Sequence, residues 1–353
     1  MAARQVAPTR RELREALAVY AAPSTTIAVA WFLADFAVLT LAIGVTIVPV
    51  HWTWKALAGL IAGIWIARLF IIGHDACHQS LTPYRWLNRV LGRLAFLPSL
   101  TPYSLWELGH NLAHHGFTNL RGRDTVWTPL DAEEFNRLSR VNQWLQKAYR
   151  SGWGVGLYYL VELWWDKLVF PPTSRGGGKR AVFARDRSLV AAFALCWIGV
   201  VALGASTFES SVAAAIVFGV LLPFTIWNCL MGFVIYVHHT APEVVWYDDG
   251  AQWSAAMPYC TATIHVEAPW MDALLHRILQ HPAHHVDMTI PFYRLRAAQA
   301  LLASIAPKEI RTVSLTWRYY WDVARCCKLY DYRTRQWQPF ETRPRRTTVS
   351  SVA

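Results

Sequence analysis

The sequence predicts an all-α integral membrane protein, with four transmembrane helices in two hairpins and a cytoplasmic helical cap that carries clustered histidines. Composition is the first reason: 54% of the 353 residues are hydrophobic and only 16% are charged, against about 25% charged in soluble domains. The 19 tryptophans fit a chain at a membrane interface. The second reason is that four apolar segments are about long enough for the ~20-residue helix that crosses a bilayer.

The four apolar segments form two pairs with short joints. The joints, around residues 51–55 and 206–210, are too short to hold a domain, so each pair is predicted to be a helical hairpin. Asp35 lies well inside the first segment, and an ionisable group there indicates a functional site by default, although the sequence names no partner for it. The segments are 25–50, 54–73, 189–205 and 211–237.

The charge pattern predicts how the hairpins are oriented in the membrane, and the net charge indicates which class of partner the chain binds. Arginines precede the first segment, residues 81–188 and the tail are also basic, and Lys55 is the only lysine or arginine in the two joints. By the positive-inside rule the two termini and the middle of the chain are cytoplasmic. The net charge of +11 fits lipid or an acidic protein better than nucleic acid, because the long apolar runs would otherwise have to be hidden.

We therefore expect a single domain over residues 1–353. Residues 157–170 (LYYLVELWWDKLVF) indicate a helix lying on the membrane surface, and residues 171–180 a connector. The six cysteines are scattered without a CxxC pair, so no disulfide framework or zinc ribbon is indicated. Along the chain we expect an N-terminal cytoplasmic segment (1–24), a hairpin (25–73), a cap segment (74–188), a second hairpin (189–237), a second cap segment (238–340) and a disordered tail (341–353).

Most of the 13 histidines fall into a few short motifs. Residues four apart on a helix lie on one face, so pairs with this spacing can reach one metal. Pro282 suits the first turn of a helix that would carry the last cluster. The motifs are GHDACHQS (His74, His78), GHNLAHHGFTN (His110, His114, His115), HPAHHVD (His281, His284, His285) and VHHT (His238, His239).

The second motif shows how the spacing leads to two metals. We expect His110 and His114 to share one metal-binding volume, with His115 pointing about a third of a turn away. The membrane helices are expected to end at Gly73 and Val237, so that the next histidines emerge at the cytoplasmic face. Four elements distant in sequence would thus place histidines at one level.

The number of imidazoles exceeds what one ion takes, so two ions are predicted. All-nitrogen ligation suits iron, copper, zinc or nickel better than magnesium or calcium. Of the adjacent pair we expect His239 to be a ligand rather than His238, because neighbours on a helix diverge. Candidates to orient the rings through their second nitrogen are Asp75, Asn111 and Asp287, and also His265 and His276 if they are not merely structural.

At this point the pattern resembles the membrane fatty acid desaturases, closest to the bacterial and cyanobacterial acyl-lipid delta-12 type. The likeness covers roughly residues 65–300 and rests on GHDACHQS, WELGHNLAHHGFTN, HHTAPE and HPAHHVDMTIPFYRLRAAQ. It implies two iron ions, O2 as oxidant, a fatty acid or fatty acyl substrate, and electrons from a ferredoxin or a cytochrome b5-like donor. The implied ligands are His74, His78, His110, His114, His115, His239, His281, His284 and His285.

The second motif departs from that type, which usually has two residues between its first two histidines. This chain has three, Asn111, Leu112 and Ala113, and resembles alkane hydroxylases and alkene-forming decarboxylases in this respect. Desaturation is the default expectation, with hydroxylation or decarboxylation of a free fatty acid to a 1-alkene as alternatives at the same site.

Two further classes are weaker alternatives. A metal transporter would place its site near the bilayer midplane, whereas these histidines lie at helix ends or outside the membrane. A haem electron carrier would need paired axial ligands and few further histidines.

Overall fold

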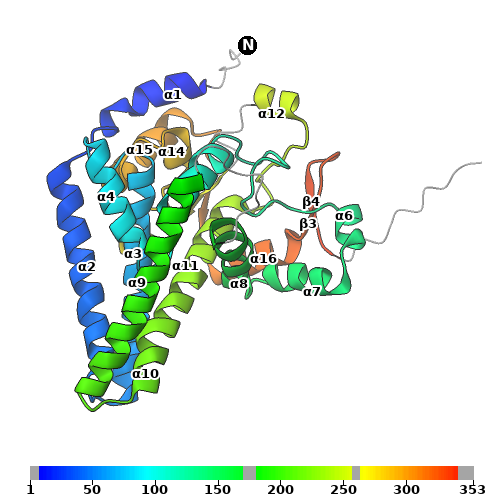
Figure 1. Cartoon of the computed structure of the whole chain (residues 1–353). Coiled ribbons are helices and arrows are strands. Elements are labelled where there is room, and N and C mark those ends of the chain that lie inside the picture. Colours follow the sequence, from blue (N-terminus) through cyan, green and yellow to red (C-terminus); the bar gives the residue numbers. More distant parts are fainter. Residues whose placement is uncertain (1–7, 170–179, 257–262, 341–353) are drawn as a thin grey trace, which may run out of the picture.

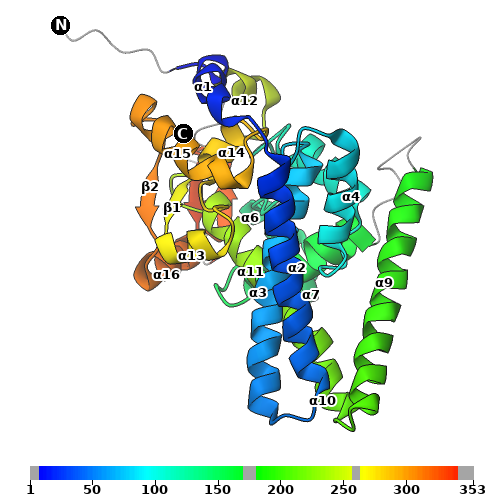
Figure 2. The ribbon, with the colours of Figure 1, turned by 90° about the vertical axis from the view of Figure 1, so that its left-hand side faces the viewer.

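The computed structural model describes residues 8–169, 180–256 and 263–340, and four of its helices are long and apolar enough to cross a membrane. Two of them form the first hairpin, and the fourth is interrupted by a stretch of π-helix. Figures 1 and 2 show these helices side by side, with the cap gathered around one end of the bundle. They are α2 (Thr25–Ile47), α3 (Trp52–Cys77), α9 (Arg180–Thr207) and the run α10 (Val212–Ile216), η5 (Val217–Leu221) and α11 (Leu222–His239).

The four predicted membrane helices are therefore confirmed, but three of them extend beyond the apolar segments. The helix α3 continues to Cys77, α11 continues to His239, and α9 begins at Arg180, ahead of its apolar part. Apolar composition marks only the part of a helix that faces hydrocarbon. The extensions are polar and pack in the cap, where Asp186 of α9 accepts from Arg93 Nε at 3.0 Å.

The two hairpins meet at the end of the bundle that lies away from the cap. Lys55 donates from Nζ to Thr46 O at 2.6 Å and to Ser210 Oγ at 2.7 Å, so one ammonium ties the two turns together. Gly63 of α3 faces α11 so closely that an added Cβ would lie 2.5 Å from Ile226 Cβ. A side chain at this glycine would force the two helices apart.

The cap is mostly helical and includes two small sheets. The strands β1 (His265–Glu267) and β2 (Thr312–Ser314) pair in parallel, and β3 (Leu329–Asp331) and β4 (Gln336–Gln338) pair antiparallel. The helices are α1 (Arg10–Leu17), η1 (Ala18–Tyr20), α4 (Arg85–Phe96), α5 (Tyr103–Glu107), η2 (Leu108–His114), α6 (Ala132–Arg137), α7 (Arg140–Tyr149), α8 (Val155–Tyr158), η3 (Tyr159–Val169), α12 (Gly250–Ala256), α13 (Pro269–Leu274), α14 (His281–Val286), α15 (Phe292–Ile305) and α16 (Trp317–Cys326).

The helix expected over residues 157–170 is present as α8 and the π-helix η3. The expected connector, apart from its last residue, and the expected disordered tail lie outside the described residues.

The N-terminal helix α1 lies across the cap and touches α14 and α15. A capping box between Thr9 and Glu12 starts this helix, and such a box satisfies two backbone donors of the first turn. Leu13 and Leu17 are fully buried in the main core. The guanidinium of Arg10 donates to the carbonyl of His285 at 3.1 Å, so α1 is fastened directly to α14.

Asp35, which had no partner in the sequence, has two in the structure. Its carboxylate accepts from Arg68 Nε of α3 at 2.8 Å and from His276 Nε2, which follows α13. All three side chains are buried. Arg68 also donates to the carbonyl of Leu274 at 2.6 Å. This cluster joins the first hairpin to the segment that leads into α14.

Candidate metal centre

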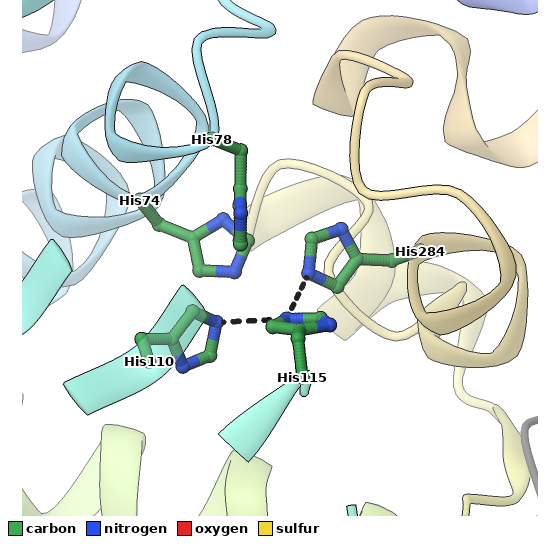
Figure 3. A group of neighbouring side chains, drawn as sticks. All are labelled: His74, His78, His110, His115 and His284. Atoms are coloured by element: carbon green, nitrogen blue, oxygen red, sulfur yellow. Dashed lines mark hydrogen bonds between the residues drawn. The ribbon is translucent and has the colours of Figure 1, made fainter. Parts of the chain in front are cut away.

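All nine predicted histidines come together in the cap, where they form two groups. Within each group the candidate ligand nitrogens lie within 4.8 Å of one another. The histidine side chains come from α3 and its C-cap residue, from η2 and the residue that follows it, from the end of α11, and from α14. The first group is His74, His78, His110, His115 and His284, drawn in Figure 3, and the second is His114, His239, His281 and His285.

In the first group, α3 supplies two rings from successive turns. His74 lies in the last turn of α3, and His78 is the residue that caps its C-terminus. Their ring centroids are 4.6 Å apart, and the rings of both approach His284 of α14. Figure 3 shows the five imidazoles converging on one volume from three separate parts of the chain.

The expected pairing of His110 with His114 is wrong. His110 belongs with His115, while His114 belongs to the second group. The reason is local: residues 108–114 form a π-helix, in which the amide of His115 donates to the carbonyl of His110 at 2.9 Å. A π-helix turn bonds residues five apart rather than four, so it brings the fifth residue back to the same side.

The second group combines α11 and α14 with His114. His239, the last residue of α11, has its Nε2 2.9 Å from Nε2 of His281, and His285 Nε2 lies 3.1 Å from the same atom. His281 and His285 are four apart on α14, and Pro282 stands in the first turn of that helix as predicted.

The spacing of the ring nitrogens fits coordination to an ion. The Nε2 atom of His115 lies 3.0 Å from Nε2 of His110 and 3.1 Å from Nε2 of His284. Two nitrogens held about 2.1 Å from one ion, as imidazoles are on zinc, lie about 3.0 Å apart when they meet at a right angle. A neutral imidazole has only one N–H, so hydrogen bonds alone do not explain why three ring nitrogens face one another. A cation bound by all three nitrogens explains this arrangement.

Burial keeps these imidazoles in the form that binds metal. Desolvation, followed by the neighbouring histidines, lowers the pKa of His110, His281 and His284 well below 6.5. Neutral imidazole is the form that ligates metals. Both ring nitrogens of His78 are buried without a hydrogen-bond partner, and such a group costs free energy unless something pairs with it. The residues present therefore fit a bound metal.

Two carboxylates orient rings through the nitrogen that faces away from the group. His74 Nδ1 donates to Asp75 Oδ1 at 2.9 Å, and Asp75 Oδ2 accepts from the amide of Phe292 at 2.6 Å. His114 Nδ1 donates to Asp124 Oδ1 at 3.0 Å. Such contacts fix the tautomer and the ring direction of a ligand. Asp75 was a candidate for this role, whereas Asp124 was missed because its ten-residue separation from His114 follows no helical period.

The other candidates to orient rings make no hydrogen bond to the nine histidines among the described residues. Asn111 donates to the carbonyl of Cys77, and His265 contacts Gln280 and Thr312. His276 is held by Asp35. The carboxylate of Asp287 accepts from Thr289 and lies 3.6 Å from Arg14.

His238 and Trp106 also lie beside the two groups of histidines. His238 turns away from both groups, and its Nδ1 donates to the carbonyl of Val234 at 2.6 Å, which agrees with the expectation that it is not a ligand. Trp106, which the sequence did not single out, stacks on His110 with ring centroids 4.1 Å apart.

A narrow apolar cavity of about 110 Å³ reaches the histidines from the side of α11 and η3. It touches five of them and therefore both groups. Its walls include Phe70, Trp106, Tyr159, Met231, Val234 and Ile278. These walls match a short stretch of hydrocarbon chain, because burying apolar surface in such a space is favourable.

The sequence model of the fatty acid desaturase family matches residues 50–317. The chain belongs to this family, as the resemblance of its histidine motifs had suggested. It is a membrane-bound oxidoreductase that carries a histidine-rich metal centre and desaturates fatty acyl chains with O2.

Three desaturases have sequences similar to this chain over most of its length. The chain is 30% identical over 296 residues to an sn-1 oleoyl-lipid 12-desaturase of Synechocystis sp., covering 81% of this chain and 78% of that protein. It is 29% identical over 277 residues to the enzyme of the same name from Picosynechococcus sp., with 77% and 75% covered. It is 29% identical over 288 residues to a chloroplastic omega-6 fatty acid desaturase of Spinacia oleracea, covering 81% of this chain and 60% of that longer protein.

Proposed function

We propose that the metal centre is a pair of iron ions, with His74, His78, His110, His115 and His284 as ligands of one and His114, His239, His281 and His285 as ligands of the other. The observation that carries this proposal is the division of nine buried histidines into two adjacent groups. All-nitrogen sites take iron, copper, zinc or nickel. Zinc has no redox chemistry, so it does not serve an oxidation.

The overall reaction balances with an external donor. A –CH2–CH2– unit loses two hydrogens, and O2 takes up four electrons and four protons to form two waters. Two of the electrons come from the acyl chain, and two come from a one-electron carrier. The carrier we propose is a ferredoxin or a cytochrome b5-like protein, and the chain's net charge of +11 favours an acidic one.

The chain's own residues position the substrate and exclude water from the site. The bound irons provide the O2 chemistry, and the protein has to hold one carbon pair of the substrate beside them. The apolar walls around Phe70, Tyr159 and Met231 exclude water and admit a hydrocarbon chain. Asp75 and Asp124 keep the rings of His74 and His114 in one orientation.

The substrate we propose is an oleoyl chain attached to a membrane lipid, with the new double bond at position 12. Support comes from the names of the two cyanobacterial relatives. The three relatives named above are all desaturases, and none favours formation of a 1-alkene. The extra residue of the second motif is taken up within the π-helix of residues 108–114, so the longer spacing does not by itself require another reaction.

We further propose that the metal centre faces the cytoplasm across a bacterial inner membrane. The four membrane helices and the excess of arginine in the cap segments support this orientation under the positive-inside rule.

The test is lipid analysis of a host that makes oleoyl lipids and expresses the chain together with a ferredoxin and its reductase. We expect 18:2 acyl chains with a double bond at position 12, located by mass spectrometry of derivatised fatty acids. His284→Gln should abolish the product. His51→Gln is the matched control, because His51 lies exposed at the start of α3, and it should leave the product unchanged.

The metal is tested separately on purified protein. We expect about two iron ions per chain, and fewer in His284→Gln. A terminal alkene or an alcohol as the product would contradict desaturation. Zinc or copper in place of iron, or retention of both irons in the variant, would contradict the metal assignment.

A further inference from the structure

A second cavity lies on another side of the cap, between α2, the loop after α13, and α15. Its volume is about 630 Å³, and its walls include Trp31, His276, Arg277, Phe292, Tyr293 and Arg296. None of its lining residues lines the cavity at the metal centre. Figure 2 shows α13, α14 and α15 on one side of α2. The two cavities are therefore separate sites.

The second cavity has an excess of positive charge. Arg277 and Arg296 come from different elements, and among the described residues no carboxylate lines the space. Arg277 is 3.3 Å from Asp272, but Arg296 is exposed and makes no ion pair or hydrogen bond with the described part of the chain. His276 is already occupied by Asp35. Arginine favours phosphate, because its planar fork of donors matches the phosphate oxygens.

The cavity also borders the membrane. Counting about 20 residues back from the end of α2, which is the length needed to cross the hydrocarbon, reaches about residue 28. Trp31 therefore lies close to the boundary, and the residue is 41% exposed, as is common for tryptophan at an interface. A lipid with its phosphate at the arginines would lay its acyl chains along α2.

We propose that this cavity binds the phosphate-bearing headgroup of an anionic membrane phospholipid, as a bound lipid distinct from the acyl chain that is oxidised. Basic pockets beside membrane helices on the cytoplasmic side recognise such headgroups. His276, a buried residue of the cavity lining, belongs to the cluster with Asp35 and Arg68. A lipid seated there touches the segment that leads into α14 without entering the cavity at the metal centre.

The test compares Arg277→Gln/Arg296→Gln with a control that loses the same charge. Arg333→Gln/Arg335→Gln serves as the control, because these arginines are exposed at the β3–β4 turn. Arg335 also matches Arg277 in its positive φ, 55° against 62°, so each double variant places one glutamine in the left-handed region. Each protein is purified in neutral detergent and titrated with phosphatidylglycerol, with phosphatidylcholine as the zwitterionic comparison, and bound lipids are counted by native mass spectrometry.

We expect the unmodified protein and the control to hold one more phosphatidylglycerol than Arg277→Gln/Arg296→Gln, or to bind it at least about tenfold more tightly. Equal binding by all three proteins overturns the proposal, and so does equal binding of phosphatidylcholine. Displacement of the lipid by the same molar concentration of inorganic phosphate would assign the site to free phosphate instead. Should the double variant not fold, Arg296→Gln alone gives the same comparison, since Arg296 makes no hydrogen bond or ion pair with the described residues.

Discussion

Replacing Asp35 by alanine should destabilise the protein strongly, because this carboxylate neutralises a buried cation. The side chains of Asp35 and Arg68 are only 2% and 8% exposed, and their charged atoms are 2.8 Å apart. Asp35 also accepts from His276. After the substitution Arg68 keeps its bond to the Leu274 carbonyl but has no counter-charge within a largely apolar surrounding.

The expected magnitude follows from the number of bonds lost. Hydrogen bonds to charged groups contribute about 1.5–3 kcal/mol each, and two are removed. Breaking one side of a buried ion pair costs about 3–5 kcal/mol, which agrees with that sum. We therefore expect Asp35→Ala to lower the free energy of unfolding by about 3–5 kcal/mol.

The assay is reversible unfolding in mixed micelles with increasing SDS, followed by tryptophan fluorescence. The control is the double variant Asp35→Leu/Arg68→Met, which removes both charges. It should be more stable than Asp35→Ala, because no uncompensated cation remains. A loss below about 1 kcal/mol for Asp35→Ala, or a double variant no more stable than the single one, would refute the reasoning.

Three further predictions concern the cap. Asp124→Asn should weaken metal binding by about 10–100-fold, because it removes the carboxylate oxygen that orients the ring of His114. The measurement is a metal titration of protein from which a chelator has removed the metal, with an unchanged circular dichroism spectrum as evidence of folding. An unchanged metal affinity would contradict the prediction. The metal-free protein should lose stability as the pH falls below about 6.5, because burial lowers the pKa of His284 and the unfolded chain then binds more protons; a flat unfolding profile between pH 7.5 and 5.5 would count against this. The neighbouring Cys327 thiol lowers the pKa of Cys326 to about 7, so iodoacetamide should modify Cys326 half-maximally near pH 7 and the buried Cys327 far more slowly, and faster labelling of Cys327 would reverse the expectation.

The membrane helices and the histidines were predictable from the sequence for simple reasons. An apolar run of about 20 residues has few alternatives to a membrane helix, and α2 lies within the apolar segment that predicted it. The histidine motifs repeat a spacing that places side chains on one face of a helix. His74 with His78 and His281 with His285 accordingly share a group. Periodicity works here because these contacts are local.

The sorting of the second motif was not predictable in this way. An α-helical period pairs His110 with His114, but a π-helix occupies residues 108–114 and pairs His110 with His115. A change of helix type depends on what the helix packs against, and here Trp106 stacks on His110. Residue spacing alone does not report such a local change in the hydrogen-bond pattern.

Composition and spacing by themselves determined that this chain crosses a membrane four times and carries nine histidines of the metal-binding type. The tertiary structure alone decided how those histidines divide into two groups, that Asp124 orients His114, that Arg68 and His276 neutralise Asp35, and that two arginines face one cavity. The physical reason is that hydrogen bonds, ion pairs and cavities join residues from different elements. Their distances are set by how the helices pack, and helix packing is not encoded in the period of any single segment.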